Sequence, residues 1–155
     1  MILQCALILR AQDSSFRYHP VYSTVLDGDK GKSLLRQCSR STTPKKVSSY
    51  ISINQDDIEK MEANFKKVYL LTSFNGFKLT SLDSCIFQYT GVMLGKKRYI
   101  YVNAVRIHSE AGLNKYYSNW KTEPIVFCDG GDDFWGVLFC IDDMQFINIA
   151  FNGMA

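Results

Sequence analysis

The spacing of apolar residues between positions 54 and 71 predicts one long amphipathic helix. Apolar side chains recur there three and four residues apart, on one helix face, at Ile58, Met61, Phe65 and Val68. Asn54 is a natural N-cap, and the acidic residues that follow it lie at the positive end of the helix dipole. We therefore expect a helix over residues 55–71 whose apolar face packs against a sheet.

The second half of the chain contains runs of apolar, aromatic and β-branched residues that are typical of β-strands. Residues 85–94 and 98–105 flank a short turn that contains Gly95, so they predict an antiparallel hairpin. Apolar residues at helical spacing predict a short second helix over residues 109–119. Three more strands are expected at Ile125–Cys128, Phe134–Ile141 and Gln145–Phe151, with the loop Asp129–Asp133 as a hairpin turn between the first two.

The first part of the chain is more polar and is rich in turn residues. Asp27–Lys32 is expected to form a turn, and short strands are expected at Val21–Leu26, Leu34–Cys38 and Val47–Ile53. Taken together, the patterns predict a single α+β domain over residues 18–155, built on a mainly antiparallel sheet of five or more strands.

The charge of the chain is weakly positive and spread out. A formal net charge of +3 without a clustered basic stripe argues against a nucleic-acid-binding protein. The most basic stretch, Lys30–Lys46, is expected to be a solvated loop, with an anion-binding surface as the alternative. Arg36 and Arg40 within it either grip an anion or serve the fold through hydrogen bonds and ion pairs, and the sequence leaves both readings open.

The N-terminus and the cysteines bear on the cellular compartment. The apolar run over residues 1–9 is too short to cross a bilayer, and we interpret residues 1–17 as a truncated export leader or an N-terminal extension. Four of the five cysteines follow this segment, which is compatible with disulfides in an oxidising compartment. Cys38 is the expected disulfide member because its segment is polar, whereas the other three lie in apolar runs and are equally compatible with buried thiols: Cys85, Cys128 and Cys140.

Candidate catalytic groups are few and have no motif around them. The two histidines are His19 and His108, and the loop Asp129–Asp133 gathers carboxylates that include Asp129 and Asp132. The chain lacks a nucleophile elbow, a metalloprotease motif, a P-loop and the spacing of a calcium-binding loop. We therefore expect no metal and no cofactor. A small hydrolase that uses Asp or His in a cleft stays an alternative.

Several distinctive motifs are spread over nearly the whole chain from about Tyr18: Gln37–Arg40 with Thr43 and Pro44, Trp120–Pro124, Cys128–Gly131 with Phe134–Val137, and Phe151–Ala155. The resemblance that they carry is to a set of small uncharacterised bacterial proteins that are often predicted to be exported. It implies export and a single-domain unit, and it implies no activity.

The first hypothesis for function is an exported, non-enzymatic protein that binds another macromolecule, as inhibitors and immunity-type proteins do. Exposed aromatic residues make good interface anchors. The candidate contact residues are Arg36, Arg40, Trp120, Asp129, Asp132 and Trp135. A third hypothesis, beside the hydrolase, is a carrier that holds an apolar ligand between helix and sheet.

Overall fold

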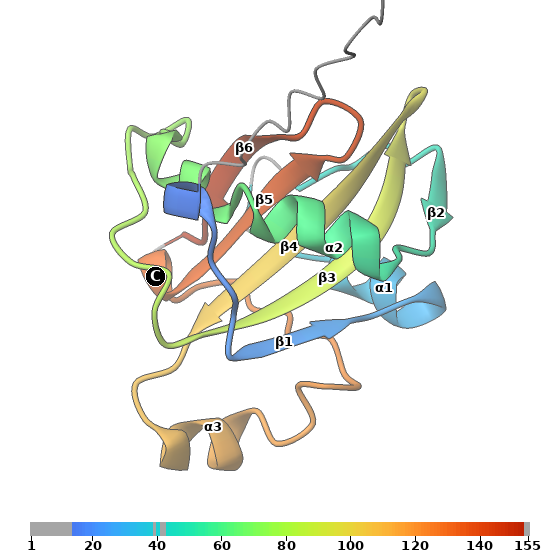
Figure 1. Cartoon of the computed structure of the whole chain (residues 1–155). Helices are drawn as coiled ribbons and strands as arrows, with labels where there is room; N and C mark the ends of the chain where they lie inside the picture. The colour runs from blue at the N-terminus through green and yellow to red at the C-terminus, as the bar shows by residue number, and fades with distance from the viewer. Residues whose placement is uncertain (1–13, 39, 41–42, 154–155) are drawn as a thin grey trace, which may run out of the picture.

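A six-stranded sheet with helices on both faces forms the core of the protein (Figure 1). This computed structural model describes residues 14–38, 40 and 43–153, and it confirms the predicted α+β fold. The strands follow the order β1-β3-β4-β5-β6, and β2 also pairs with β3. Their bounds are Tyr22–Val25 (β1), Ser49–Ile51 (β2), Cys85–Leu94 (β3), Lys97–Arg106 (β4), Phe134–Cys140 (β5) and Gln145–Phe151 (β6).

Most strand pairs are antiparallel, as the sequence predicts. The expected hairpin of β3 and β4 is present, and its register puts Val92 opposite Tyr99. The exception is β1, which runs parallel to β3. β3 is long enough to hold two partners on one edge, because β1 pairs with residues 86–89 and β2 with residues 91–93.

The predicted helix over residues 55–71 occurs as two shorter elements. α2 spans Gln55–Glu62, and the 3₁₀-helix η2 spans Phe65–Leu70. Asn54 caps α2 as expected, because its side chain accepts a hydrogen bond of 2.9 Å from the Asp57 amide. The expected continuity is wrong because the Asn64 amide donates to the Lys60 carbonyl, at 2.9 Å, and so competes with backbone bonding.

α2 and η2 pack on one face of the sheet over an aromatic core. Met61, Phe65 and Val68 are fully buried, as the apolar stripe predicts, whereas Ile58 is only partly buried. The Phe65 ring lies 5.2 Å from that of Phe87 on β3. The apolar-ligand carrier stays a hypothesis.

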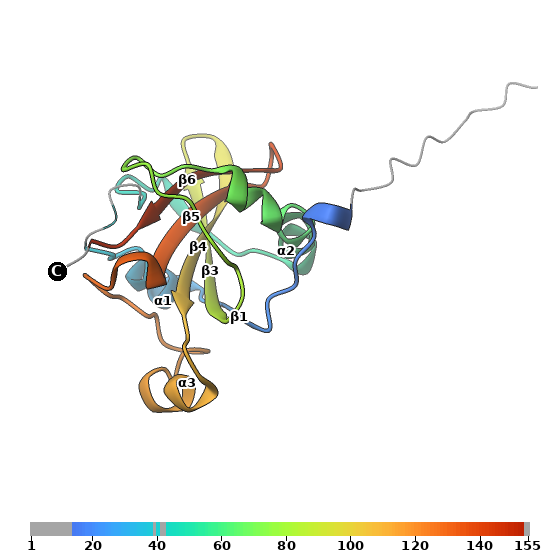
Figure 2. The ribbon, with the colours of Figure 1, turned by 90° about the vertical axis from the view of Figure 1, so that its left-hand side faces the viewer.

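A helix, α1, lies on the other face of the sheet (Figure 2), and the sequence did not predict it. α1 spans Gly28–Leu34, where a turn and the start of a strand were expected. Leu34 is fully buried, and a Cβ added to Gly31 would lie 2.3 Å from Thr90 Oγ1. The glycine therefore permits close contact of helix and sheet, whereas the local pattern suggested a turn.

The remaining elements follow the predictions in part. η1 spans Ser14–Phe16, and α3 spans Glu110–Tyr116 after the N-cap Ser109, so the second helix is confirmed. β5 and β6 are also confirmed. The strand expected at Ile125–Cys128 is absent from the described structure, which is irregular there until the 3₁₀-helix η3 at Gly131–Asp133.

Two further findings concern membranes and the N-terminus. Within the described ranges, every helix is too short or too polar to cross a bilayer. Residues 1–17 were interpreted as a leader or an N-terminal extension. Residues 1–13 of this segment lie outside the described residues.

Candidate functional site

The face of the sheet that carries α1 has a polar centre. Strand alternation directs Gln88 and Thr90 of β3 and Asn103 of β4 to this face, and all three are buried. Apolar clusters flank them, one around Ile86 and Val105 and the other around Leu34, Val92 and Leu138. Buried polar side chains need hydrogen-bond partners, so we expect these residues to bind polar groups of the chain that covers this face.

The amide of Gln88 holds the irregular segment that follows α3. Its Nε2 donates to the carbonyls of Trp120 and Glu123 at 2.7 Å each, and its Oε1 accepts from the Ile125 amide at 2.8 Å. Asn103 Nδ2 then donates to the Ile125 carbonyl at 3.0 Å. Residues 125–128 were expected to be a strand. Side-chain amides, and not a neighbouring strand, bond the backbone of Ile125 in this segment.

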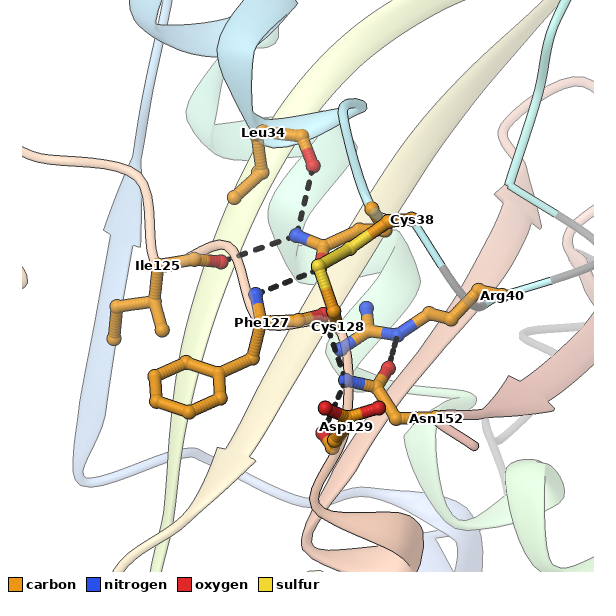
Figure 3. The surroundings of a disulfide bond; sticks show 9 residues. Leu34, Cys38, Arg40, Ile125, Phe127, Cys128, Asp129 and Asn152 are labelled. Carbon is orange, nitrogen blue, oxygen red and sulfur yellow. Dashed lines mark hydrogen bonds between the residues drawn. A yellow bond between two sulfur atoms is a disulfide. The ribbon is translucent and has the colours of Figure 1, made fainter. Parts of the chain in front are cut away.

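Two more amides continue this arrangement up to Asp129. Gln37 Nε2 donates to the carbonyls of Leu34 and Ile125 at 3.0 Å each, and Asn152 Nδ2 donates to those of Phe127 and Asp129 at 2.9 and 2.8 Å (Figure 3). The loop Asp129–Asp133 is therefore not a hairpin turn between adjacent strands, which corrects that prediction. The positive φ of Gly130 and Gly131, 97° and 58°, does match the expected role of glycine there.

Arg40 lies at the centre of this polar face. Its guanidinium donates from Nε to Asn152 Oδ1 at 2.6 Å, and from Nη1 to Asn103 Oδ1 at 2.6 Å and to the Tyr101 hydroxyl at 3.0 Å. Gly136 makes room for it, because a Cβ there would lie 2.9 Å from Nη1. The side chain is 3% exposed, and burial lowers its pKa below the usual value.

The acceptors of Arg40 among the described residues are all neutral. No ion pair joins it to a carboxylate in the part of the chain that the structure describes. Among the described residues, its Nη2 is buried without a hydrogen-bond partner, and so is the hydroxyl of nearby Thr43. A buried cation with neutral acceptors and a free donor is an unfavourable arrangement that a bound anion would relieve.

A disulfide closes the loop that carries Arg40. Cys38 is bonded to Cys128, which is 90 residues away in sequence, with a Cα–Cα distance of 5.0 Å (Figure 3). Cys85 and Cys140 are free and buried. Since Asn152 joins Arg40 to the residues on either side of Cys128, the covalent and hydrogen-bonded links brace the same loop.

A basic pocket of about 600 Å³ opens beside this loop. Its lining includes Arg40 and three exposed cations, from Lys32 of α1, Arg36 and Lys45. The chain from Lys30 to Gln55 contains no acidic residue. The other lining residues are Leu35, Gln37, Cys38, Thr43, Pro44, Val47 and Tyr50, so no carboxylate contributes to the described lining.

Both tryptophans proposed as interface anchors are in the interior. Trp135 is fully buried beside Phe87, with ring centroids 6.0 Å apart, and Trp120 is 8% exposed against Tyr22. Their indoles complete the core, so the expected exposure of these two rings is wrong. Binding of another macromolecule by other residues stays a prediction.

The two histidines pair with carboxylates other than the Asp129 and Asp132 singled out from the sequence. Asp129 and Asp132 are exposed. His108 Nε2 contacts Asp133 Oδ2 at 2.8 Å, and His19 Nδ1 contacts Glu62 Oε2 at 2.6 Å, at separate places on the surface. Across the described residues, no group of three or more His, Cys, Asp or Glu side chains is placed to hold a metal ion.

Several residues of the site were not predicted from the sequence. Gln88 and Asn103 are single polar residues inside apolar strand runs, and Asn152 follows the last strand. The signal that points to them is their polarity at positions where alternation predicts burial. The sequence does not show which partners they have, because these lie up to 112 residues away.

Comparison of the chain with family models, with curated proteins and with solved structures gave no match. The resemblance to small exported bacterial proteins therefore stays a prediction. The site described above rests on geometry alone.

Proposed function

We propose that this protein binds an anionic ligand in the basic pocket formed by Lys32, Arg36, Arg40 and Lys45. The observation that supports it is the buried charge of Arg40, which has neutral acceptors and lines a pocket without described carboxylates. An oxyanion such as phosphate, sulfate or carboxylate supplies the missing negative charge. Of the two readings of Arg36 and Arg40, the structure gives Arg40 a role in the fold, and the proposal adds anion binding.

The cations of the pocket have two different roles: Arg40 positions the ligand, and Arg36 and Lys45 attract it. Arg40 is fixed by three hydrogen bonds, so its charge is pre-organised and little side-chain entropy is lost on binding. Arg36 and Lys45 are exposed and have no ion-pair partner within the described chain. They attract the ligand through solvent, and this attraction weakens as salt increases.

Titration calorimetry with inorganic phosphate and sulfate at low ionic strength tests the proposal. Arg36→Ala removes one exposed donor and should raise Kd by roughly 10- to 100-fold, since a hydrogen bond to a charged group contributes about 1.5–3 kcal/mol. Lys66→Ala is the matched control, because Lys66 is an exposed cation of η2, outside the pocket lining. The proposal is wrong if the wild-type protein shows no saturable binding, or if both variants bind like the wild type.

We also propose that the protein works in an oxidising compartment. The Cys38–Cys128 bond supports this, because structural disulfides are rare in reducing compartments. Mass spectrometry of unreduced protein from its native compartment should find peptides that contain these two cysteines joined. Free thiols at both positions would contradict it.

A further inference from the structure

The basic pocket is larger than a bare oxyanion requires. A volume of about 600 Å³ lies in the range of pockets that enclose a whole small organic molecule. An oxyanion bound by Arg36 and Arg40 fills only a small part of that space. The residues that line the remaining space therefore indicate the chemical character of the rest of the ligand.

That lining contains apolar and aromatic side chains. Leu35 and Val47 are half-buried, and both pack on the cluster that includes Leu34 and Val92. Pro44 adds further hydrocarbon surface to the pocket. Apolar surface beside a group of cations fits a ligand that has an anionic end and an apolar end.

Tyr50 supplies an aromatic ring to the same pocket. Its side chain, on β2, is 38% exposed, so part of the ring surface is available to a ligand. Lys32 Nζ lies 5.7 Å from the ring centroid, a distance typical of a cation–π contact. This contact joins α1 to β2 and places a ring next to one of the four cations.

We infer that the ligand is an oxyanion joined to a planar apolar ring, such as a phosphate or sulfate ester of an aryl compound. This inference rests on the proposed function. The cations bind the oxyanion, and Leu35, Val47 and Tyr50 contact the ring. The described lining has no carboxylate to hold a cationic substituent, so the ring end is uncharged.

The test compares three probes by titration calorimetry: inorganic phosphate, glycerol phosphate and phenyl phosphate. Phenyl phosphate should bind about tenfold more tightly than glycerol phosphate, because only the former can stack on Tyr50 and bury apolar surface. Tyr50→Ala should abolish that difference when each affinity is expressed relative to that of the same variant for inorganic phosphate, since the substitution also removes the contact of Lys32 with the ring. Tyr116→Ala, which alters a ring that is 68% exposed on α3, should change neither affinity.

The possible outcomes separate the two proposals. Equal affinities for phenyl and glycerol phosphate, with inorganic phosphate still bound, overturn the inference about the ring and leave the anion-binding function standing. An advantage of phenyl phosphate that persists in Tyr50→Ala also overturns the proposed contact with the ring. Absence of binding for all three probes overturns the proposed function together with the inference.

Discussion

Arg40 brings a positive charge into the centre of a sheet face and distributes it over neutral oxygens. The side chains of Asn103, Asn152 and Tyr101 accept its hydrogen bonds. Hydrogen bonds to a charged group are stronger than neutral ones, and they offset part of the desolvation cost. The same amides also hold the chain at residues 125–129, so stability and the proposed binding site depend on shared residues.

Substitution of Asn152 should show most clearly that stability depends on these shared residues. Asn152→Ala leaves Arg40 Nε and the carbonyls of Phe127 and Asp129 without these partners. We expect the free energy of unfolding to fall by about 2–3 kcal/mol, since unsatisfied buried groups cost about 1–3 kcal/mol each and water can reach some of them. Urea denaturation measures this. The control Asn75→Ala, at an exposed position, should change stability by no more than about 0.5 kcal/mol.

Cys85 should be chemically inert in the folded protein. It is 2% exposed, and burial raises the pKa of its thiol to about 11. At pH 8 the side chain is therefore the neutral thiol, whereas the thiolate is the nucleophile. Alkylation followed by peptide mapping should find Cys85 unmodified in native protein and modified after denaturation. Rapid modification under native conditions would contradict its burial.

The same pKa shift makes stability depend on alkaline pH. In the unfolded chain a thiol ionises near pH 8.5, whereas Cys85 in the folded chain stays protonated up to about 11. The folded state therefore binds more protons in this interval, and the contribution of Cys85 to stability is lost as the pH rises through it.

At the level of elements, η2 contributes one deeply buried ring to the core. Phe65 packs against Tyr18, Phe87 and Phe146, with ring centroids 5.7, 5.2 and 5.5 Å away. Phe65→Ala should lower the free energy of unfolding by about 3–5 kcal/mol, because it leaves a cavity. Leu70→Ala is a control in the same short helix, since Leu70 is 70% exposed. A loss for Phe65→Ala no larger than for Leu70→Ala would contradict the packing of η2 on the sheet.

The disulfide joins the segment after α1 to the irregular segment before η3. Its long loop of 90 residues means that reduction should destabilise the fold by about 2–5 kcal/mol. Reduction should also weaken anion binding, because Cys38 and Arg40 are two residues apart in one loop. Denaturation and phosphate titration with and without a thiol reductant measure both effects. The double variant Cys38→Ser with Cys128→Ser should not respond to the reductant, and an equal response would assign the effect to another bond.

For the whole molecule, the two faces of the sheet have different roles. One face is covered by α2 and η2 over an aromatic core, and its packing stabilises the fold. The other face, under α1 and residues 120–129, combines two smaller apolar clusters with a polar centre. We assign the proposed binding to the second face, where a ligand adds to the stability of the less densely apolar side.

Ligand binding should therefore raise the melting temperature. A ligand at 100 times its Kd stabilises the native state by about 2.7 kcal/mol, which corresponds to a rise in Tm of roughly 5–10 °C for a protein of this size. Sulfate also stabilises proteins without binding to a site. The difference between wild type and Arg36→Ala at equal sulfate concentration isolates the specific effect. Identical increases in both proteins would indicate only the general effect of the salt.

The sequence by itself determined the elements whose signals are local and regular. Runs of apolar, aromatic and β-branched residues bounded by turns predict β3, β4, β5 and β6, and the N-cap Asn54 with its apolar stripe predicts the start and the buried face of α2. These predictions succeed because β3 pairs with β4, and β5 with β6, across short turns, and because α2 has one apolar face.

Tertiary structure alone decided the site and the segments around it. α1 forms where a glycine-rich turn was expected, because Gly31 fits against Thr90 and Leu34 is buried. Residues 125–128 look like a strand, but their backbone groups pair with amides from distant parts of the chain. The local pattern can mark a polar residue in an apolar run, but it does not show which distant groups that residue contacts. For that reason the sequence could point to Arg40 but could not tell its structural role from anion binding.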